Sequence, residues 1–191
     1  HYDTSRTANG GGPGANDGAS GPAVLIETAT ALAGNPALAS QIELVLFDGR
    51  EPVRQFSSHD GLYGSRFHAA GRATPPVRLN LAILLGMVGA HEGIYSLTAD
   101  TPAAIAQRVQ ELASAQDNSR VAAAARPAWD DHLPFLHAGI PALLLTDSAY
   151  PYVRTADDTL DRLDAGALAR TGSLVLKLLA EPPRSPAAPP P

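Results

Sequence analysis

Gly14-Ala15-Asn16-Asp17-Gly18-Ala19-Ser20-Gly21 is the stretch around which the rest of this chain is organised. Glycines on both sides of Asp17 allow a tight turn and a close approach of the backbone to a ligand. An apolar run over residues 23–33 follows at once and predicts a helix, because Pro22 is tolerated in a first turn and Gly34-Asn35-Pro36 ends the pattern. We therefore expect a loop, anchored on a helix, that aims the Asp17 carboxylate.

Alternating apolar and helical patterns predict the fold class. Short, nearly continuous apolar runs at residues 41–48, 79–88 and 141–146 are typical of strands buried on both faces. Helical spacing covers residues 62–70, 102–115 and 165–179, with Thr101 as a plausible cap of the second helix. This order predicts an α/β fold with a mostly parallel sheet, helices on both faces and strand ends that face Asp17.

Size and composition predict one domain with a Pro-rich end. A chain of 191 residues is long enough for one core, and we place the domain at residues 1–180 and a Pro-rich tail or linker at 181–191. His1 and Asp3 lie two residues apart, as on one face at the end of a strand, so we expect the first strand of the sheet to lie upstream of this sequence.

Charge and cysteine content exclude several classes of function. The net charge is -5 and no basic block occurs, which argues against a nucleic-acid partner. No apolar segment approaches the roughly 20 residues that span a bilayer, so we expect no membrane span. The chain has no cysteine, which excludes disulfides and thiolate metal sites.

Polar residues cluster where the apolar elements end. The clusters are His1-x-Asp3, Asp17, Asp48-Gly49-Arg50-Glu51, Asp130-Asp131-His132 and Arg154-Thr155. Histidines and carboxylates from separate loops can bind a cation such as zinc. Taken singly, a His or Asp at the end of a strand is more often a turn residue or a cap than a metal ligand.

Other catalytic arrangements are weaker. Ser20 and Ser65 lack the Gly-x-Ser-x-Gly pattern of a nucleophile elbow, and Ser20 is well explained as a helix cap. The glycine run at residues 10–14 lacks the lysine of a phosphate-binding loop. The isolated histidines are interpreted as surface or structural residues: His59, His68, His91 and His137.

The chain resembles the zinc-dependent family-28 metallopeptidases, and within them the glutaminyl-peptide cyclotransferase branch. The segments that show the resemblance are residues 1–3, 14–21, 46–51, 60–66, 87–90, 130–136 with 138–141, and 155–161. It implies a three-layer α/β sandwich with a mixed, mostly parallel sheet, and an extracytoplasmic location. It also implies an ancestral activity on peptide N-termini, either removal of a residue or cyclisation of glutamine.

The metal positions of the family are only partly retained. The resemblance assigns His1, Asp17 and Glu51 to ligand positions. Gly86 and Arg154 stand where the family has an aspartate and a histidine ligand, and Arg50 stands where it has the glutamate that acts as general base.

The substrate positions are also altered. Asp130 is retained at a position that contacts substrate in cyclases, and it is the one catalytic-type residue that the comparison leaves. Trp129 stands beside it in place of a glutamine or glutamate, and Val153 replaces the tryptophan of cyclases. We assign substrate binding to Trp129, Asp130, His132 and Tyr63.

A charge count suggests what replaces the metal. The altered set of six positions holds two carboxylates and two arginines, so it is neutral without a cation, whereas an intact set needs metal ions for neutrality. We therefore expect Arg50, Arg154 or both to bond to Asp17 or Glu51, and no zinc to be bound. Two hypotheses follow: a non-catalytic family member that keeps a peptide-binding cleft, and an active zinc aminopeptidase or glutaminyl cyclotransferase with an unusual site.

Overall fold

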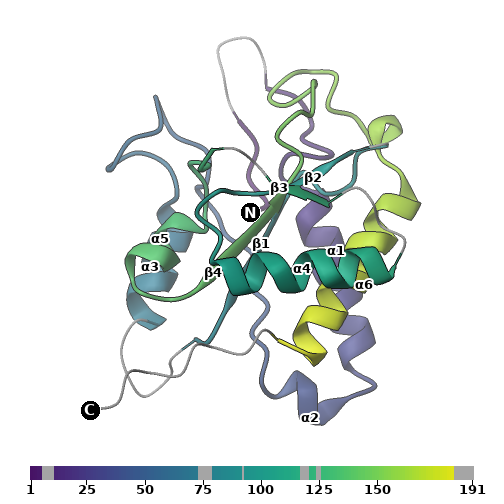
Figure 1. Ribbon diagram of the computed structural model, residues 1–191. Coiled ribbons are helices and arrows are strands. Elements are labelled where there is room, and N and C mark those ends of the chain that lie inside the picture. Colours follow the sequence, from purple (N-terminus) through teal and green to yellow (C-terminus); the bar gives the residue numbers. More distant parts are fainter. Residues whose placement is uncertain (6–10, 73–78, 92, 117–120, 124–125, 183–191) are drawn as a thin grey trace.

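The computed structural model describes residues 1–5, 11–72, 79–91, 93–116, 121–123 and 126–182 (Figure 1). The elements, in chain order, are α1 (Ser20–Leu32), α2 (Pro36–Ala39), α3 (Tyr63–Arg72), β1 (Ala82–Gly86), β2 (Tyr95–Leu97), α4 (Ala103–Ala115), β3 (Val121–Ala123), α5 (Leu133–His137), β4 (Ala142–Thr146), the 3-10 helix η1 (Leu160–Arg162) and α6 (Ala165–Ala180).

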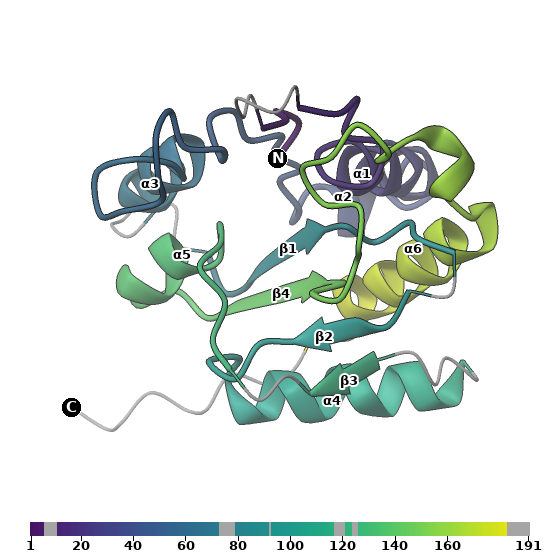
Figure 2. The same ribbon diagram turned by 90° about the horizontal axis from the view of Figure 1, so that it is seen from above.

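The described strands form one mixed sheet in the order β1-β4-β2-β3. β1 and β4 are parallel, with Ala82 opposite Ala142 and Gly86 opposite Thr146. β2 runs antiparallel to β4 and parallel to β3. The sheet is covered by helices on both faces (Figure 2), so the predicted three-layer α/β sandwich is confirmed.

Alternation along β4 divides the core into two layers. Leu143 and Leu145 are fully buried against the cluster formed with α1, α4 and α6. Ala142 and Leu144 point to the opposite face, toward the cluster formed with α3 and α5. Because successive side chains of a strand point to opposite faces, a strand buried on both sides must be apolar throughout, which is what the run at residues 141–146 shows.

The longer elements lie where the sequence predicts them. The helix after the Asp17 loop is α1, and the patterns at residues 62–70, 102–115 and 165–179 correspond to α3, α4 and α6. The apolar runs at residues 79–88 and 141–146 contain β1 and β4. The sequence does not predict β2, β3 or α5, because three to five residues are too short for a hydrophobic period to show.

The prediction of a strand at residues 41–48 is wrong. This segment forms no helix or strand, and it joins no ladder of the described sheet. Leu44 and Leu46 are 37% and 48% exposed, although an apolar run of this kind was expected to be covered on both faces. An apolar pattern indicates that a segment tends to be buried. A β-strand also needs a neighbouring strand with which its backbone can form hydrogen bonds.

Two predicted caps are also wrong. Ala19 holds the cap position of α1, and Ser20 instead donates its hydroxyl to the Asn16 carbonyl at 2.7 Å and accepts from Val88 N at 3.0 Å. Pro102 precedes α4, and the Thr101 hydroxyl lies 3.2 Å from that of Thr98. Ser20 therefore joins the Asp17 loop to the end of β1, which is a tertiary role that local sequence does not show.

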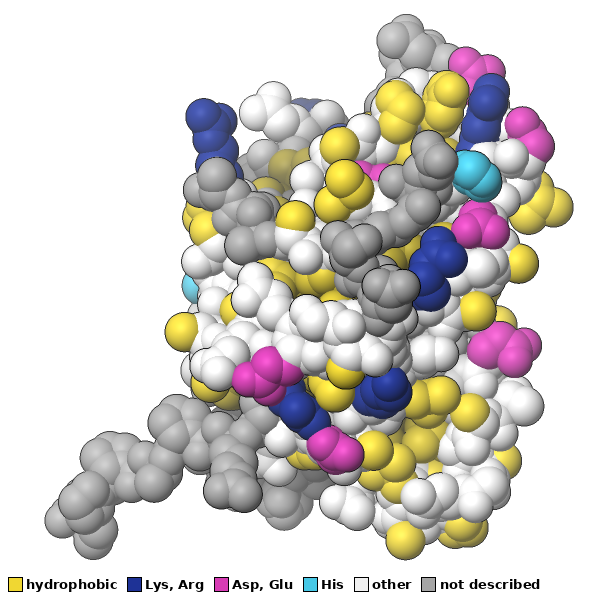
Figure 3. Space-filling view, turned by 45° about the vertical axis from the view of Figure 1, so that its right-hand side comes forward, with side chains coloured by type: hydrophobic (Ala, Val, Ile, Leu, Met, Phe, Trp, Pro, Cys, Tyr) yellow, Lys and Arg dark blue, Asp and Glu magenta, His cyan; other side chains and the backbone are white. Residues whose placement is uncertain are grey.

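Residues 183–191, most of the predicted Pro-rich tail, lie outside the described residues. Within the described part of the chain, no helix has the length and apolar character needed to cross a bilayer. Acidic and basic side chains are interspersed on the face shown in Figure 3, and no basic patch gathers there.

Close packing of α1 on β1 predicts the effect of adding one methyl group. A Cβ at Gly21 would lie 2.6 Å from the Leu85 carbonyl oxygen, whereas a Cβ at Gly172 of α6 would meet only Val24 at 3.9 Å. Gly21→Ala should lower the free energy of unfolding by about 1–3 kcal/mol. The matched control, Gly172→Ala, should be neutral or stabilising by up to about 1 kcal/mol. Urea titration of both variants measures the difference, and equal effects would contradict this packing.

Candidate active site

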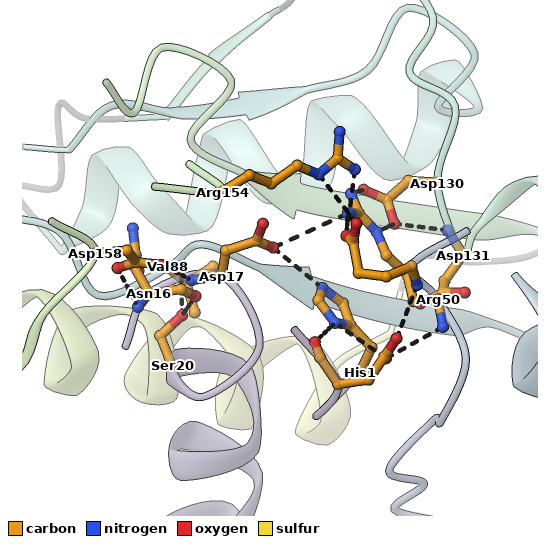
Figure 4. A network of polar contacts seen from close by, with 12 residues as sticks. His1, Asn16, Asp17, Ser20, Arg50, Val88, Asp130, Asp131, Arg154 and Asp158 are labelled. Atoms are coloured by element: carbon orange, nitrogen blue, oxygen red, sulfur yellow. Dashed lines mark hydrogen bonds and ion pairs between the residues drawn. The ribbon is translucent and has the colours of Figure 1, made fainter. Parts of the chain in front are cut away.

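The charged residues that the sequence places at the ends of elements converge in one buried cluster (Figure 4). Its members are His1, Asp17, Arg50, Glu51, Asp130 and Arg154. They come from loops far apart in the chain. Each loop is held in place by hydrogen bonds, many of them to its main chain.

The Asp17 loop is held by a second carboxylate. Asp158, 1% exposed, accepts hydrogen bonds from Asn16 N at 2.8 Å and Asp17 N at 2.9 Å. The Tyr150 hydroxyl donates to the same carboxylate at 2.8 Å. On the other side of the loop, the Asn16 side-chain oxygen accepts from Gly89 N at 2.9 Å. The Asp17 side chain is therefore aimed by protein contacts alone.

His1 lies against Asp17 and Asp3. Its Nε2 is 3.4 Å from Asp17 Oδ1, and its Nδ1 donates to the Asp3 carbonyl at 3.0 Å. Burial alone would lower the pKa of His1, but the contacts with the two aspartates outweigh it and raise the pKa to about 10. The imidazole is therefore protonated at neutral pH in the metal-free protein, and a metal ion would have to displace that proton to bind.

Asp3 positions the turn that follows residue 48. Its carboxylate accepts from Arg50 N at 3.1 Å and from Glu51 N at 2.8 Å. Burial would raise the pKa of Asp3, but His1 and these two N–H groups lower it. The sequence predicts that Asp3 lies beside His1, but it does not show that Asp3 organises the neighbouring loop.

Arg50 is the centre of the cluster. Its guanidinium makes a forked pair with Asp130, at 2.8 Å from Nη2 to Oδ2 and 3.3 Å from Nε to Oδ1, and it also bonds to Glu51. Asp17 Oδ1 lies 4.0 Å away. Burial would raise the pKa of Asp130 and lower that of Arg50, but their mutual attraction reverses both shifts. Both groups are therefore charged.

Arg154 approaches Glu51 from the opposite side. Its Nε and Nη2 lie 3.0 and 3.2 Å from the two Glu51 oxygens, so the expected contact between these arginines and the retained glutamate is confirmed. Arg154 has a φ of 59°, an unfavourable conformation for this residue type. The Phe56 ring lies 5.3 Å from the Arg50 guanidinium and 5.0 Å from that of Arg154, at cation–π distance from both.

Gly86 leaves space where a side chain would fit. It lies at the end of β1 beside a small cavity of about 30 Å³, which His1, Asp130 and Asp131 also line. A Cβ at this glycine would have only an ordinary contact, 3.7 Å from the Thr146 hydroxyl. The backbone therefore tolerates a larger residue here.

The residues assigned to substrate binding lie in different surroundings. Asp130 belongs to the charged cluster, whereas Trp129 and Tyr63 are 49% and 45% exposed. The Tyr63 hydroxyl donates to Asp60 at 3.1 Å, and the fully buried His132 has its Nε2 3.1 Å from Asp100. Their role toward a substrate stays a prediction.

Sequence reasoning missed several residues of this site. It did not single out Phe56 or Asp158, it named Asp131 only as part of a polar cluster, and it gave Asp3 no role beyond its neighbour His1. Asp158 follows another aspartate in the chain, and no local pattern shows which of the two is buried. Their contacts are made across the fold, so no spacing in the sequence indicates them.

The residues present do not fit a zinc ion. Within the part of the chain that the structure describes, no three His, Cys, Asp or Glu side chains are grouped as a metal would require. Three negative groups, Asp17, Glu51 and Asp130, face three positive ones, the protonated His1 and the two arginines. A guanidinium offers no lone pair and adds repulsion to a cation.

Comparison with known proteins identifies the family. The model of peptidase family M28 matches residues 1–179. The chain belongs to this family. Among solved structures it is similar to a glutaminyl cyclase of an Acidobacteriales bacterium, with 30% identity and a TM-score of 0.79 over 87% of this chain and 61% of that one. A leucine aminopeptidase precursor of Bacteroides thetaiotaomicron shares the fold at 23% identity, with a TM-score of 0.75 over 88% of this chain and 62% of that one.

Curated relatives place this M28 chain near the glutaminyl cyclase branch. The glutaminyl-peptide cyclotransferase of Bos taurus is 31% identical over 64% of this chain and 41% of its own length. A glutaminyl-peptide cyclotransferase-like protein of the same organism is 28% identical over 95% of this chain and 55% of its own length. The M28 chain thus spans about half the length of these relatives.

Asp131 predicts a pH dependence of stability. Burial and the neighbouring Asp130 charge raise the pKa of Asp131 to about 6. The Ser65 hydroxyl, which donates to Asp131 at 2.5 Å, lowers this pKa but does not cancel the increase. An acid whose pKa is raised on folding loses stability as pH increases from its unfolded pKa to its folded one. Asp131→Asn removes this loss, so the stability of the variant relative to the parent should rise by about 2 kcal/mol from pH 4 to pH 7. Denaturant titrations at both pH values measure it, and a constant difference would contradict the raised pKa.

Proposed function

We propose that this M28 chain is a non-catalytic, glutaminyl cyclase-like domain in which two guanidinium groups take over the structural role of the metal ions. The observation that supports it is the pairing of Arg50 and Arg154 with the retained carboxylates Glu51 and Asp130. Such contacts are expected where arginine side chains take the place of metal ions as the cations that pair with these carboxylates.

Electrostatics favours this exchange. Buried carboxylates without partners are unstable, and the cost amounts to several kcal/mol for each ion. Arg50 and Arg154 supply permanent charges: Arg154 makes a forked pair with Glu51, and Arg50 makes a forked pair with Asp130 and a further bond to Glu51. A divalent cation would have to displace them or bind beside them, and either route is unfavourable.

The proposal also rests on the missing proton acceptor. The resemblance places the general base at Arg50, and a guanidinium stays protonated at any physiological pH. The nearest carboxylates already accept hydrogen bonds from it. With its lone pairs occupied and its charge compensated, such a carboxylate is a poor base.

A single reversal at Arg154 should weaken the protein without creating a metal site. Arg154→His removes two hydrogen bonds from the buried Glu51, which should lower the free energy of unfolding by about 1–2 kcal/mol. Arg72→His is the control, because it breaks a similar forked pair with the exposed Glu43 and should cost less than about 1 kcal/mol. Denaturant titration in chelator measures both, and an Arg154→His variant that binds zinc tightly would contradict the proposal.

Restoring all three altered positions should restore metal binding. Arg50→Glu, Gly86→Asp and Arg154→His together return the carboxylates and the histidine of the family, and Gly86 has room for a side chain. Zinc should bind this triple variant and raise its melting temperature, whereas the parent should show no such binding. Calorimetric titration of chelator-treated proteins makes the comparison. Arg54→Glu with Arg126→Glu is the charge-matched control, because both residues are exposed and the net charge changes equally.

The outcomes separate the hypotheses. If the parent binds zinc with submicromolar affinity, the hypothesis of an active zinc aminopeptidase or glutaminyl cyclotransferase is favoured instead. An assay for cyclisation of a peptide with N-terminal glutamine then tests that hypothesis. If the folded triple variant stays metal-free, the assignment of these positions is wrong. Binding of peptide N-termini stays a prediction, and the same titration tests it with free and acetylated peptides.

A further inference from the structure

A cavity of about 580 Å³ lies outside the charged cluster. Its walls come from the loop between β1 and β2, from the segment that follows β4, and from η1. None of the six residues of the charged cluster lines it. We call this space between Gly93, Asp147, Tyr152 and Arg162 the η1 pocket.

Hydrogen bonds within the protein hold the walls of the η1 pocket. His91 N donates to the Arg162 carbonyl at 3.1 Å, so the loop after β1 is joined to η1. The Tyr150 hydroxyl donates to the buried Asp158 at 2.8 Å, which holds the segment after β4. Because these contacts already form the pocket, a ligand would have little of it to order.

Asp147 supplies a buried carboxylate with one unused oxygen. The residue is 5% exposed, and its Oδ1 accepts from Ala149 N at 3.0 Å. Within the described part of the chain, no donor bonds to its Oδ2. A Cβ at Gly93 would lie 3.0 Å from this oxygen, so a larger residue there would crowd it. Burial raises the pKa of Asp147, although the Ala149 N–H group lowers it. A cationic donor in the pocket would stabilise such a carboxylate.

Arg162 supplies a guanidinium that has no hydrogen-bonded acceptor among the described residues. Its Cζ lies 4.4 Å from the centroid of the Tyr152 ring, and this cation–π contact orients the group. Asp161 pairs with it only at 3.7 Å, from a side chain that is 71% exposed, so the pair is weak. The N–H donors of Arg162 are therefore available to an anion.

We propose that the η1 pocket binds a small dipolar ligand, an α-amino acid or a short peptide, whose ammonium group donates to Asp147 and whose carboxylate accepts from Arg162. Both residues line the pocket, but no ion pair within 4.0 Å joins them. A ligand with both charges would satisfy both residues at once, whereas a simple amine or a simple acid would leave one of them unpaired. The inference does not depend on the proposed loss of catalysis, because the charged cluster takes no part in it.

The apolar surface of the pocket specifies the side chain of the ligand. Ile94 is 53% exposed, and the neighbouring walls at Ala149 and Pro151 are exposed as well. Covering this surface removes apolar groups from water, which favours binding. An aliphatic side chain such as that of leucine therefore suits the pocket.

The test titrates three leucine compounds into the protein by calorimetry. Leucine carries both charges, leucinamide lacks the carboxylate, and N-acetylleucine lacks the ammonium group. Leucine should bind at least about tenfold more tightly than either of the other two. The dipeptide leucyl-leucine distinguishes the two sources of the ligand: tighter binding than leucine assigns the pocket to peptides, and weaker binding assigns it to free amino acids.

Two variants assign each charge of the ligand to its residue. Asp147→Asn keeps an oxygen for Ala149 N, and it should weaken leucine binding at least about tenfold while leaving N-acetylleucine unchanged. Arg162→Met should weaken leucine binding by a similar factor while leaving leucinamide unchanged.

Matched controls make the same charge changes outside the pocket. Asp157→Asn alters an exposed carboxylate, and Arg170→Met alters an arginine whose side chain is 36% exposed, against 39% for Arg162. Both controls should bind leucine as the parent does. Thermal unfolding checks that each variant is folded, and if Arg162→Met is not, the comparison of the three leucine compounds in the parent decides the role of that residue.

Three results would overturn the proposal. The first is the absence of saturable binding of leucine and leucyl-leucine up to about 20 mM. The second is equal affinity for leucine, leucinamide and N-acetylleucine. The third is leucine binding that is unchanged in both Asp147→Asn and Arg162→Met, which would place the ligand elsewhere on the protein.

Discussion

Glu51 is the side chain on which the arrangement of the site depends. Two guanidinium groups, Arg50 and Arg154, bond to this one buried carboxylate, and the Phe56 ring lies within cation–π distance of both. Like charges at such proximity repel unless an anion lies between them. Removing Glu51 would therefore leave Arg154 without its carboxylate and Arg50 with Asp130 alone, whereas the charges of the intact cluster balance.

Carboxylates that bind main-chain N–H groups set the framework around this cluster. Asp158 receives the amides of Asn16 and Asp17, and Asp3 receives those of Arg50 and Glu51. An anion bound by two amides is stable when buried, because the hydrogen bonds favour its charged form. The loops of the site are thus held in place by hydrogen bonds within the protein itself.

The site and the open edge of the sheet meet at His1. On one side His1 contacts the Asp17 carboxylate, and on the other it lines the cavity beside β1. His1 therefore connects the charged cluster to the cavity at the carboxyl end of β1.

The amino-acid sequence by itself determined the local features of this protein. Helical periodicity located α1, α4 and α6, and the charges of Arg50 and Arg154 predicted that at least one of these arginines bonds to a carboxylate of the site. Only the tertiary structure decided that residues 41–48 are not a strand, because strand formation depends on a hydrogen-bonded neighbour as much as on the residues themselves. It also decided that Arg50 pairs with Asp130, 80 positions away in the chain. The charge and the helical periodicity of a segment follow from its own residues. The partner of a side chain across the fold depends instead on how the intervening elements pack.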